Sequence, residues 1–137
     1  MIRTFIDAGV LIYAARGQNE IAELALQVLE DDRREFASSI FLKLEVLPKA
    51  IYNQQNSEIK FYETFFQAVT YWANDINRII KNAYQESSQF GLGAMDALHI
   101  AAAVSVGATE FITNEKPLKS IHRTQSIKVI SIHPSSG

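Results

Sequence analysis

The spacing of apolar residues predicts a chain in which short buried strands alternate with amphipathic helices. Residues 2–6 and 127–132 are short runs rich in β-branched and aromatic side chains, which are typical of strands. Between them, apolar residues recur every three or four positions, which is the spacing of a helix that buries one face. The clearest such stripe is Ile21, Leu24, Ala25, Val28 and Leu29.

The order of these elements predicts an α/β fold. Strands are predicted at residues 2–6, 35–38, 109–113 and 127–132, and the segment 69–73 is irregular or strand-like. Helices are predicted at residues 8–15, 20–29, 40–52, 58–68, 76–84 and 93–103, with a short helical turn at 116–121. Pro48 should kink or break its helix. Helices between most strands favour a mainly parallel sheet covered on both faces, in one domain spanning residues 1–137.

The segment 93–103 is predicted to be a buried helix, because apolar residues and alanines surround most of its circumference. It carries one carboxylate, Asp96, in its first turn. A buried carboxylate is costly unless something pairs with it, and the helix N-terminus favours its ionised form. An ionised, inward-facing Asp96 would therefore bind a cation.

Three further acids are predicted to lie near Asp96. Asp7 and Glu115 follow strands directly, and Glu45 lies on a helix that follows a strand, as Asp96 does. Because the carboxyl ends of parallel strands share one edge, all four can converge there. Two local alternatives remain open: Asp7 as a simple helix cap, and Glu45 as a surface residue paired with Lys49.

Such a cluster points to a metal ion. Crowded carboxylates repel one another and raise one another's pKa, so a divalent cation would stabilise them. Oxygen ligands without cysteine or clustered histidine suit Mg²⁺ or Mn²⁺. Carboxylates that bind such cations are typical of enzymes that hydrolyse phosphodiester bonds.

Composition excludes several other classes. The chain has 137 residues, 47% hydrophobic and 20% charged, as in an ordinary globular domain. It has no cysteine, no apolar run of about 18 residues and an early acidic residue, so we expect a cytoplasmic protein without disulfides, membrane span or signal peptide. The net charge of −2 argues little against nucleic acid, because committing four of the 15 acids to a metal leaves 11 against 13 bases. Residues 133–137 are expected to be a flexible tail.

Four stretches carry a resemblance to a known family. They are Phe-Ile-Asp and Val-Leu-Ile-Tyr-Ala within 5–14, Ser-Ser and Leu-Glu-Val-Leu-Pro within 38–48, Met-Asp-Ala-Leu-His-Ile-Ala-Ala-Ala at 95–103 and Phe-Ile-Thr-Asn-Glu at 111–115. In this order and spacing they resemble the PIN domain, as in the VapC-type toxin ribonucleases of toxin–antitoxin pairs. The resemblance spans nearly the whole chain, and the third stretch is its most distinctive part.

This resemblance implies a three-layer α/β/α sandwich and metal-dependent cleavage of RNA. Asp7, Glu45 and Asp96 correspond to the family's first three acids. The fourth is usually an aspartate two residues after a threonine, where this chain has Glu115 after Thr113. The implied catalytic set is thus Asp7, Glu45, Asp96 and Glu115, with Asp7, Asp96 and Glu115 as ligands of Mg²⁺ or Mn²⁺.

A second departure lies close to the first acid. The family usually has Ser or Asn two positions after that aspartate, where this chain has Gly9. A polar contact to the site is therefore missing at this position. Gly9 and Glu115 together support an alternative, in which a PIN-like domain has lost turnover and binds RNA or protein.

Several neighbouring residues have two interpretations each. His99 is either packed beside the site or a base or phosphate contact, and Thr113 either orients Glu115 or a water or is an ordinary strand residue. Arg16 and Lys49 are candidate phosphate contacts, as are Lys43 and Lys116.

The resemblance also implies partners. An antitoxin would cover the acidic edge and use a groove along residues 20–29 or 58–69, and family members often form homodimers. Two rival enzyme classes fit less well. A haloacid-dehalogenase-like phosphatase needs a second aspartate where Gly9 stands, and a receiver domain needs an acidic pair near the start of the chain.

Overall fold

A computed structural model describes residues 1–134, and within them five strands form one sheet in the order β3-β2-β1-β4-β5. Every neighbouring pair of these strands is parallel. The strands are β1 (Ile2–Ile6), β2 (Arg34–Ser39), β3 (Tyr71–Ala73), β4 (Glu110–Thr113) and β5 (Lys128–Ser131). The predicted parallel sheet is therefore confirmed.

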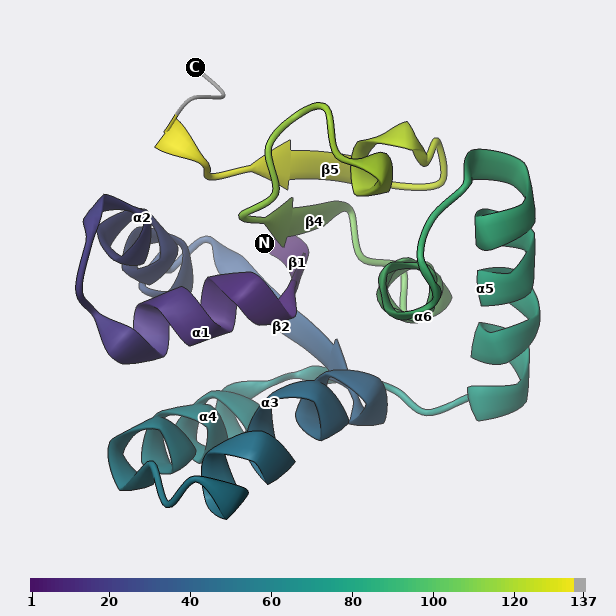
Figure 1. Cartoon of the computed structure of the whole chain (residues 1–137). Coiled ribbons are helices and arrows are strands. Elements are labelled where there is room, and N and C mark those ends of the chain that lie inside the picture. The colour runs from purple at the N-terminus through teal and green to yellow at the C-terminus, as the bar shows by residue number, and fades with distance from the viewer. Residues whose placement is uncertain (135–137) are drawn as a thin grey trace.

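Helices connect the strands and cover both faces of the sheet (Figure 1). They are α1 (Ala8–Arg16), α2 (Glu20–Leu29), α3 (Ile40–Tyr52), α4 (Asn56–Ala68), α5 (Ile76–Phe90) and α6 (Ala94–Ser105), with a 3₁₀ turn, η1 (Ser120–Arg123). The α/β/α sandwich that the sequence predicted is the observed architecture.

Alternation along the strands divides the core into two clusters. Phe5, Ala37 and Phe111 lie side by side on β1, β2 and β4 and pack under α5 and α6. Ile6 and Ile112 face the other way and pack with α1 to α4. Because neighbouring residues of a strand point to opposite faces, the same short strands supply both clusters.

Three details differ from the sequence prediction. The segment 69–73, predicted to be irregular or strand-like, contains a regular strand, β3, which pairs with β2 and brings the sheet to five strands. Pro48 does not break its helix, since α3 runs on to Tyr52, so of the two predicted effects only a kink remains open. The short helical turn expected at 116–121 is the 3₁₀ turn η1, which begins at Ser120.

The ends of the helices follow local capping chemistry. The side chains of Asn19, Ser39 and Asp75 accept hydrogen bonds from backbone N–H groups in the first turns of α2, α3 and α5. Gly107, just beyond α6, has a φ of +70°, which favours glycine at a helix end.

Of the predicted flexible tail, residues 135–137 lie outside the described residues. His133 donates a backbone hydrogen bond to the Ser131 hydroxyl, with N and O 3.1 Å apart.

Within residues 1–134, no helix is long and apolar enough to cross a membrane.

Candidate functional site

The candidate site lies at the edge of the sheet where β1 and β4 end. Asp7 follows β1 and caps α1, because its Oδ1 accepts a hydrogen bond of 2.8 Å from the Ala8 N–H. Its Oδ2 accepts a hydrogen bond of 2.9 Å from the Thr113 hydroxyl at the end of β4. Asp7 therefore has the capping role and is also held in one orientation at the sheet edge.

The loop after β4 is held in place by its own hydrogen bonds. The Glu115 N–H donates to Thr113 Oγ1 over 3.1 Å, and the Glu115 carbonyl accepts from the Ser131 hydroxyl over 2.7 Å. His122 Nε2 lies 3.0 Å from the same carbonyl. Thr113 thus links Asp7 to the backbone of Glu115, a role beyond that of an ordinary strand residue.

Glu45 contacts a different partner from the one expected. His99 on α6 is 1% exposed, and its Nε2 lies 2.6 Å from Glu45 Oε2 on α3. This bond replaces the surface pair with Lys49 that the spacing allowed. His99 is therefore a packed residue that ties Glu45 to the helix that carries Asp96.

Electrostatics show that the four acids share one region. Burial raises the pKa of Asp96 to about 6, and repulsion from Asp7, Glu115 and Glu45 adds to the shift. Burial also raises the pKa of Asp7, which His99 and the Thr113 hydrogen bond partly offset. A positive ion among these carboxylates would relieve both penalties.

The donor chemistry fits a hard divalent cation. Asp7, Glu45, Asp96 and Glu115 offer only oxygen ligands, which Mg²⁺ and Mn²⁺ prefer. Within residues 1–134, no three acidic or histidine side chains lie close enough to hold one ion together. This arrangement suits an ion that keeps several waters and binds directly to one or two carboxylates, as Mg²⁺ usually does.

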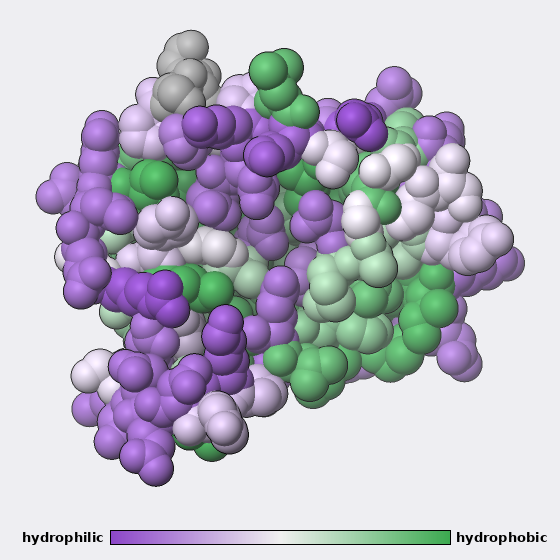
Figure 2. Space-filling model, in the orientation of Figure 1, coloured by the Kyte–Doolittle hydropathy of each residue, from purple (hydrophilic) through white to green (hydrophobic). Residues whose placement is uncertain are grey.

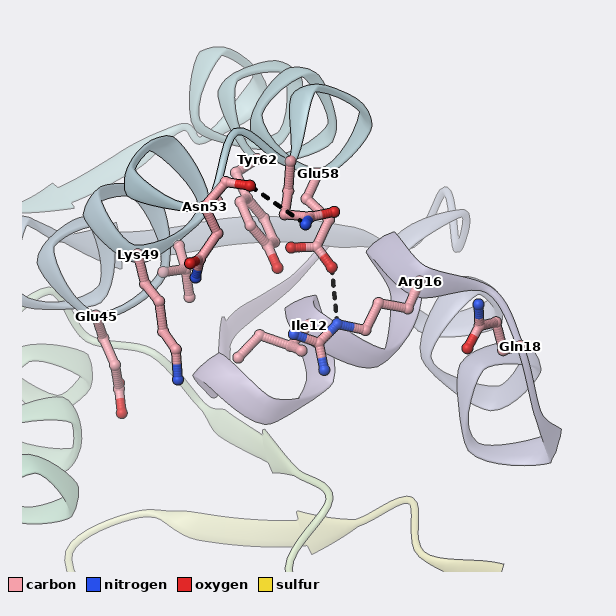
Figure 3. A pocket seen from close by; sticks show the side chains of 11 residues that line it. Ile12, Arg16, Gln18, Glu45, Lys49, Asn53, Glu58 and Tyr62 are labelled. Carbon is pink, nitrogen blue, oxygen red and sulfur yellow. Dashed lines mark hydrogen bonds and ion pairs between the residues drawn. The ribbon is translucent and has the colours of Figure 1, made fainter.

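A polar pocket of about 720 Å³ opens between α1, α3 and α4, and of the four acids only Glu45 lines it (Figure 3). Glu45 and Lys49 project side by side from α3 at one end of it. Arg16 lies farther along and is paired with Glu58, with Arg16 Nε 2.7 Å from Glu58 Oε1. Burial raises the pKa of Tyr62 to about 12, so its phenol stays protonated. Of the four candidate phosphate contacts, Arg16 and Lys49 line this pocket, and Lys43 and Lys116 do not.

Sequence reasoning missed Asn114. An ideal Cβ built on Gly9 would lie 2.0 Å from the Asn114 side-chain oxygen, so this amide fills the space beside the first turn of α1. Its position between Thr113 and Glu115 was the available signal.

The all-parallel sheet between two layers of helices is the architecture that the sequence resemblance implied. The model of the PIN domain family matches residues 4–123 of the 137-residue chain. The chain therefore belongs to the PIN domain family. This family generally comprises nucleases, and its members generally use divalent metal ions.

Solved structures with a similar fold come from toxin–antitoxin complexes. A chain of VapBC2 from Rickettsia felis, bound to a DNA fragment from its promoter, aligns with a TM-score of 0.70 and 15% identity over 95% of this chain and 98% of that one. A chain of DNA-bound VapBC from Salmonella typhimurium aligns with a TM-score of 0.71 and 15% identity over 96% of this chain and 98% of that one. A chain of VapBC-1 from nontypeable Haemophilus influenzae aligns with a TM-score of 0.68 and 16% identity over 95% of this chain and 98% of that one.

At sequence identities of 15–16%, the similarity to these structures shows a shared fold alone. No curated protein matches the chain.

Proposed function

We propose that the protein is a Mg²⁺- or Mn²⁺-dependent endoribonuclease and the toxin of a toxin–antitoxin pair, acting in the cytoplasm. The observation that carries the proposal is the placement of Asp96 near Asp7, Glu115 and Glu45. Burial raises the pKa of Asp96 to about 6, and these three carboxylates add to the shift. The family supports nuclease chemistry, and the similar structures are of toxin–antitoxin complexes.

Each acid has a distinct part in this proposal. Asp7 is held in one orientation by Ala8 and Thr113, which suits a direct metal ligand, while Asp96 and Glu115 would act on the ion directly or through its bound waters. When bound, the metal lowers the pKa of a bound water and offsets charge on the phosphate. Glu45 is oriented by His99, which suits a group that positions the attacking water.

The adjoining pocket supports an RNA substrate. Lys49 is exposed next to Glu45, and Arg16 is 58% exposed despite its ion pair. Both cations line the pocket that Glu45 borders, and an RNA phosphate bound there would compete with Glu58 for Arg16. The chain's mild net charge of −2 does not oppose this, because four of its 15 acids would be committed to the proposed metal site, which leaves 11 against 13 bases.

The surface supports two partners. An apolar groove of about 420 Å³ between α2, β2 and α4 is lined by Leu29, Phe36, Phe61 and Phe65, and it suits an amphipathic helix of an antitoxin. Hydrophobic surface also gathers in the lower right of Figure 2, over α3 and the neighbouring part of α5. Ile40, Leu44, Ile76 and Ile80 on these helices are exposed, which supports a homodimer through this face.

A cleavage assay tests the enzymatic claim. Purified protein is incubated with a labelled mixed RNA pool, with Mg²⁺, with Mn²⁺ and with EDTA. Asp96→Asn is the test variant, and Asp32→Asn is the matched control because Asp32 is exposed in the turn before β2. We expect cleavage that requires metal and Asp96 and is unaffected by Asp32→Asn.

The same assay separates the alternative function. Gly9 and Glu115 depart from the family pattern and favour a binding module without turnover. That module would bind RNA or metal in a gel-shift or calorimetric titration without cleaving any RNA in the pool. Cleavage that persists in EDTA or in Asp96→Asn would contradict the proposed site.

A further inference from the structure

We infer that the side-chain amide of Asn114 supplies the polar group that Gly9 lacks, and so acts as a positioning residue of the metal site. The inference rests on the proposed function and deepens it. It concerns Gly9, the residue two positions after Asp7, where the family usually has a polar side chain.

The backbone brings the two residues together. The Asp7 N–H donates to the Ile112 carbonyl over 2.9 Å, so the end of β4 lies against the start of α1. Thr113 then bonds Asp7, and Asn114 follows at once. Residue 114 therefore leaves the sheet beside the first turn of α1, where Gly9 is the second helical residue.

The Asn114 side chain occupies the volume of a side chain at position 9. An ideal Cβ on Gly9 would lie 2.0 Å from Asn114 Oδ1, 2.7 Å from its Cγ and 3.0 Å from its Nδ2. All three atoms belong to the side chain of Asn114, and none to its backbone. A residue larger than glycine at position 9 therefore displaces this amide, and the amide stands where such a residue would have stood.

The backbone at Gly9 does not itself require glycine. Among the described residues, the glycines with positive φ are Gly17, Gly91 and Gly107. Gly9 lies inside α1, where glycine costs about 1 kcal/mol relative to alanine. The close contact with Asn114 is thus the structural reason for glycine at this position.

The chemistry of the amide suits the role. An asparagine side chain offers an acceptor oxygen and two N–H donors, and a serine hydroxyl likewise both accepts and donates. No hydrogen bond joins the Asn114 amide to another group in residues 1–134, so it remains available to a metal-bound water or a phosphate. Asn114 is half-buried between Thr113, which bonds Asp7, and Glu115, which repels Asp96.

Substitutions at both positions test the inference. The variants are Asn114→Ala, Gly9→Ala, Gly9→Ser and the double variants that combine each glycine substitution with Asn114→Ala. Asn77→Ala, on the exposed side of α5, is the control for amide removal. Mn²⁺ affinity is measured by calorimetry, thermal unfolding in EDTA reports folding, and RNA cleavage is recorded in parallel.

We expect Asn114→Ala to weaken Mn²⁺ binding roughly 10-fold, as loss of a group that orients a metal site does. Gly9→Ala should weaken it equally, because the methyl group displaces the amide, while the unfolding midpoint in EDTA is unchanged or higher. Combining the two should add nothing. Gly9→Ser should bind Mn²⁺ more tightly than Gly9→Ala, with or without Asn114, because its hydroxyl takes over the lost role.

Three results would overturn the inference. They are wild-type Mn²⁺ affinity in Asn114→Ala or Gly9→Ala, additive losses in their double variant, or Gly9→Ser no better than Gly9→Ala. In each case the wild-type protein still binds Mn²⁺ and cleaves RNA, so the proposed function survives. If the wild-type protein neither binds Mn²⁺ nor cleaves, the proposed function fails and the inference falls with it.

Discussion

Replacing Asp96 with asparagine should stabilise the metal-free protein while abolishing its activity. Folding raises the pKa of Asp96 from its ordinary value of 3.8 to about 6, with burial as the main cause and repulsion from Asp7 as the next. Above pH 6 the carboxylate is charged in both the folded and unfolded chain, and the folded chain carries the cost. Asparagine keeps the shape and removes the charge.

The size of the effect follows from the shift. One pKa unit corresponds to about 1.4 kcal/mol, so the full shift would be worth about 3 kcal/mol. Asp96 is only partly buried, and solvent screening reduces this to about 1–2 kcal/mol. For a chain of this size, that raises the unfolding midpoint of Asp96→Asn by roughly 5 °C near pH 7.5.

The pH dependence has a definite sign. Because the pKa of Asp96 is raised on folding, the folded chain binds more protons between about pH 4 and 6, and wild-type stability falls as the pH rises through this window. The difference in free energy of unfolding between Asp96→Asn and the wild type should therefore reach its maximum above pH 6. At pH 4.5 it should be less than half as large.

Thermal unfolding in EDTA at pH 4.5 and 7.5 measures this gap, with Asp32→Asn as the control for a charge removed from an exposed site. Adding Mn²⁺ at pH 7.5 should then stabilise the wild type far more than Asp96→Asn. A destabilised Asp96→Asn in EDTA, or a gap independent of pH, would refute the electrostatic reasoning.

Three further substitutions probe the groups around the acids. His99→Phe keeps the packing and removes the bond to Glu45, so RNA cleavage should fall about 10-fold while His99→Gln retains more of it. Thr113→Val loses both hydrogen bonds of the hydroxyl, including that to Asp7, and should lower the free energy of unfolding by about 1–3 kcal/mol. Arg16→Gln breaks an exposed ion pair and should change that free energy by less than about 1 kcal/mol, while KM for RNA rises and kcat holds.

Each of these has a clear contrary outcome. Wild-type cleavage by His99→Phe would mean that the bond to Glu45 has no functional part. Equal stability of Thr113→Val and Thr113→Ser would mean that the hydroxyl contributes nothing to folding. An unchanged KM in Arg16→Gln would remove Arg16 from the substrate path.

The sheet and its acidic edge were predictable because both follow from local sequence. Alternation along short strands and the helical stripes between them required parallel crossovers, and parallel strands end at one edge. β3 was harder to assign because three residues, Tyr71–Ala73, are too few to show alternation. Its identity depends on pairing with β2, which is a long-range contact.

The partners of the site residues were not predictable for the same reason. The local spacing of Glu45 and Lys49 favoured a pair on α3, but the approach of α6 brings His99 to Glu45 instead. The filling of the space at Gly9 by Asn114 likewise depends on how the loop after β4 meets α1. Local patterns identified the candidate site residues, and tertiary packing determined which groups each of them contacts.

Titration of the purified protein with Mn²⁺ by calorimetry at pH 7.5 tests most directly whether the acidic edge is a metal site. We expect the wild type to bind Mn²⁺, Asp32→Asn to bind it equally well and Asp96→Asn to bind it at least 10-fold more weakly. Binding should also weaken at pH 5, because Asp96 must lose its proton to bind the ion. Absence of Mn²⁺ binding, or binding unaffected by Asp96→Asn, would contradict the account.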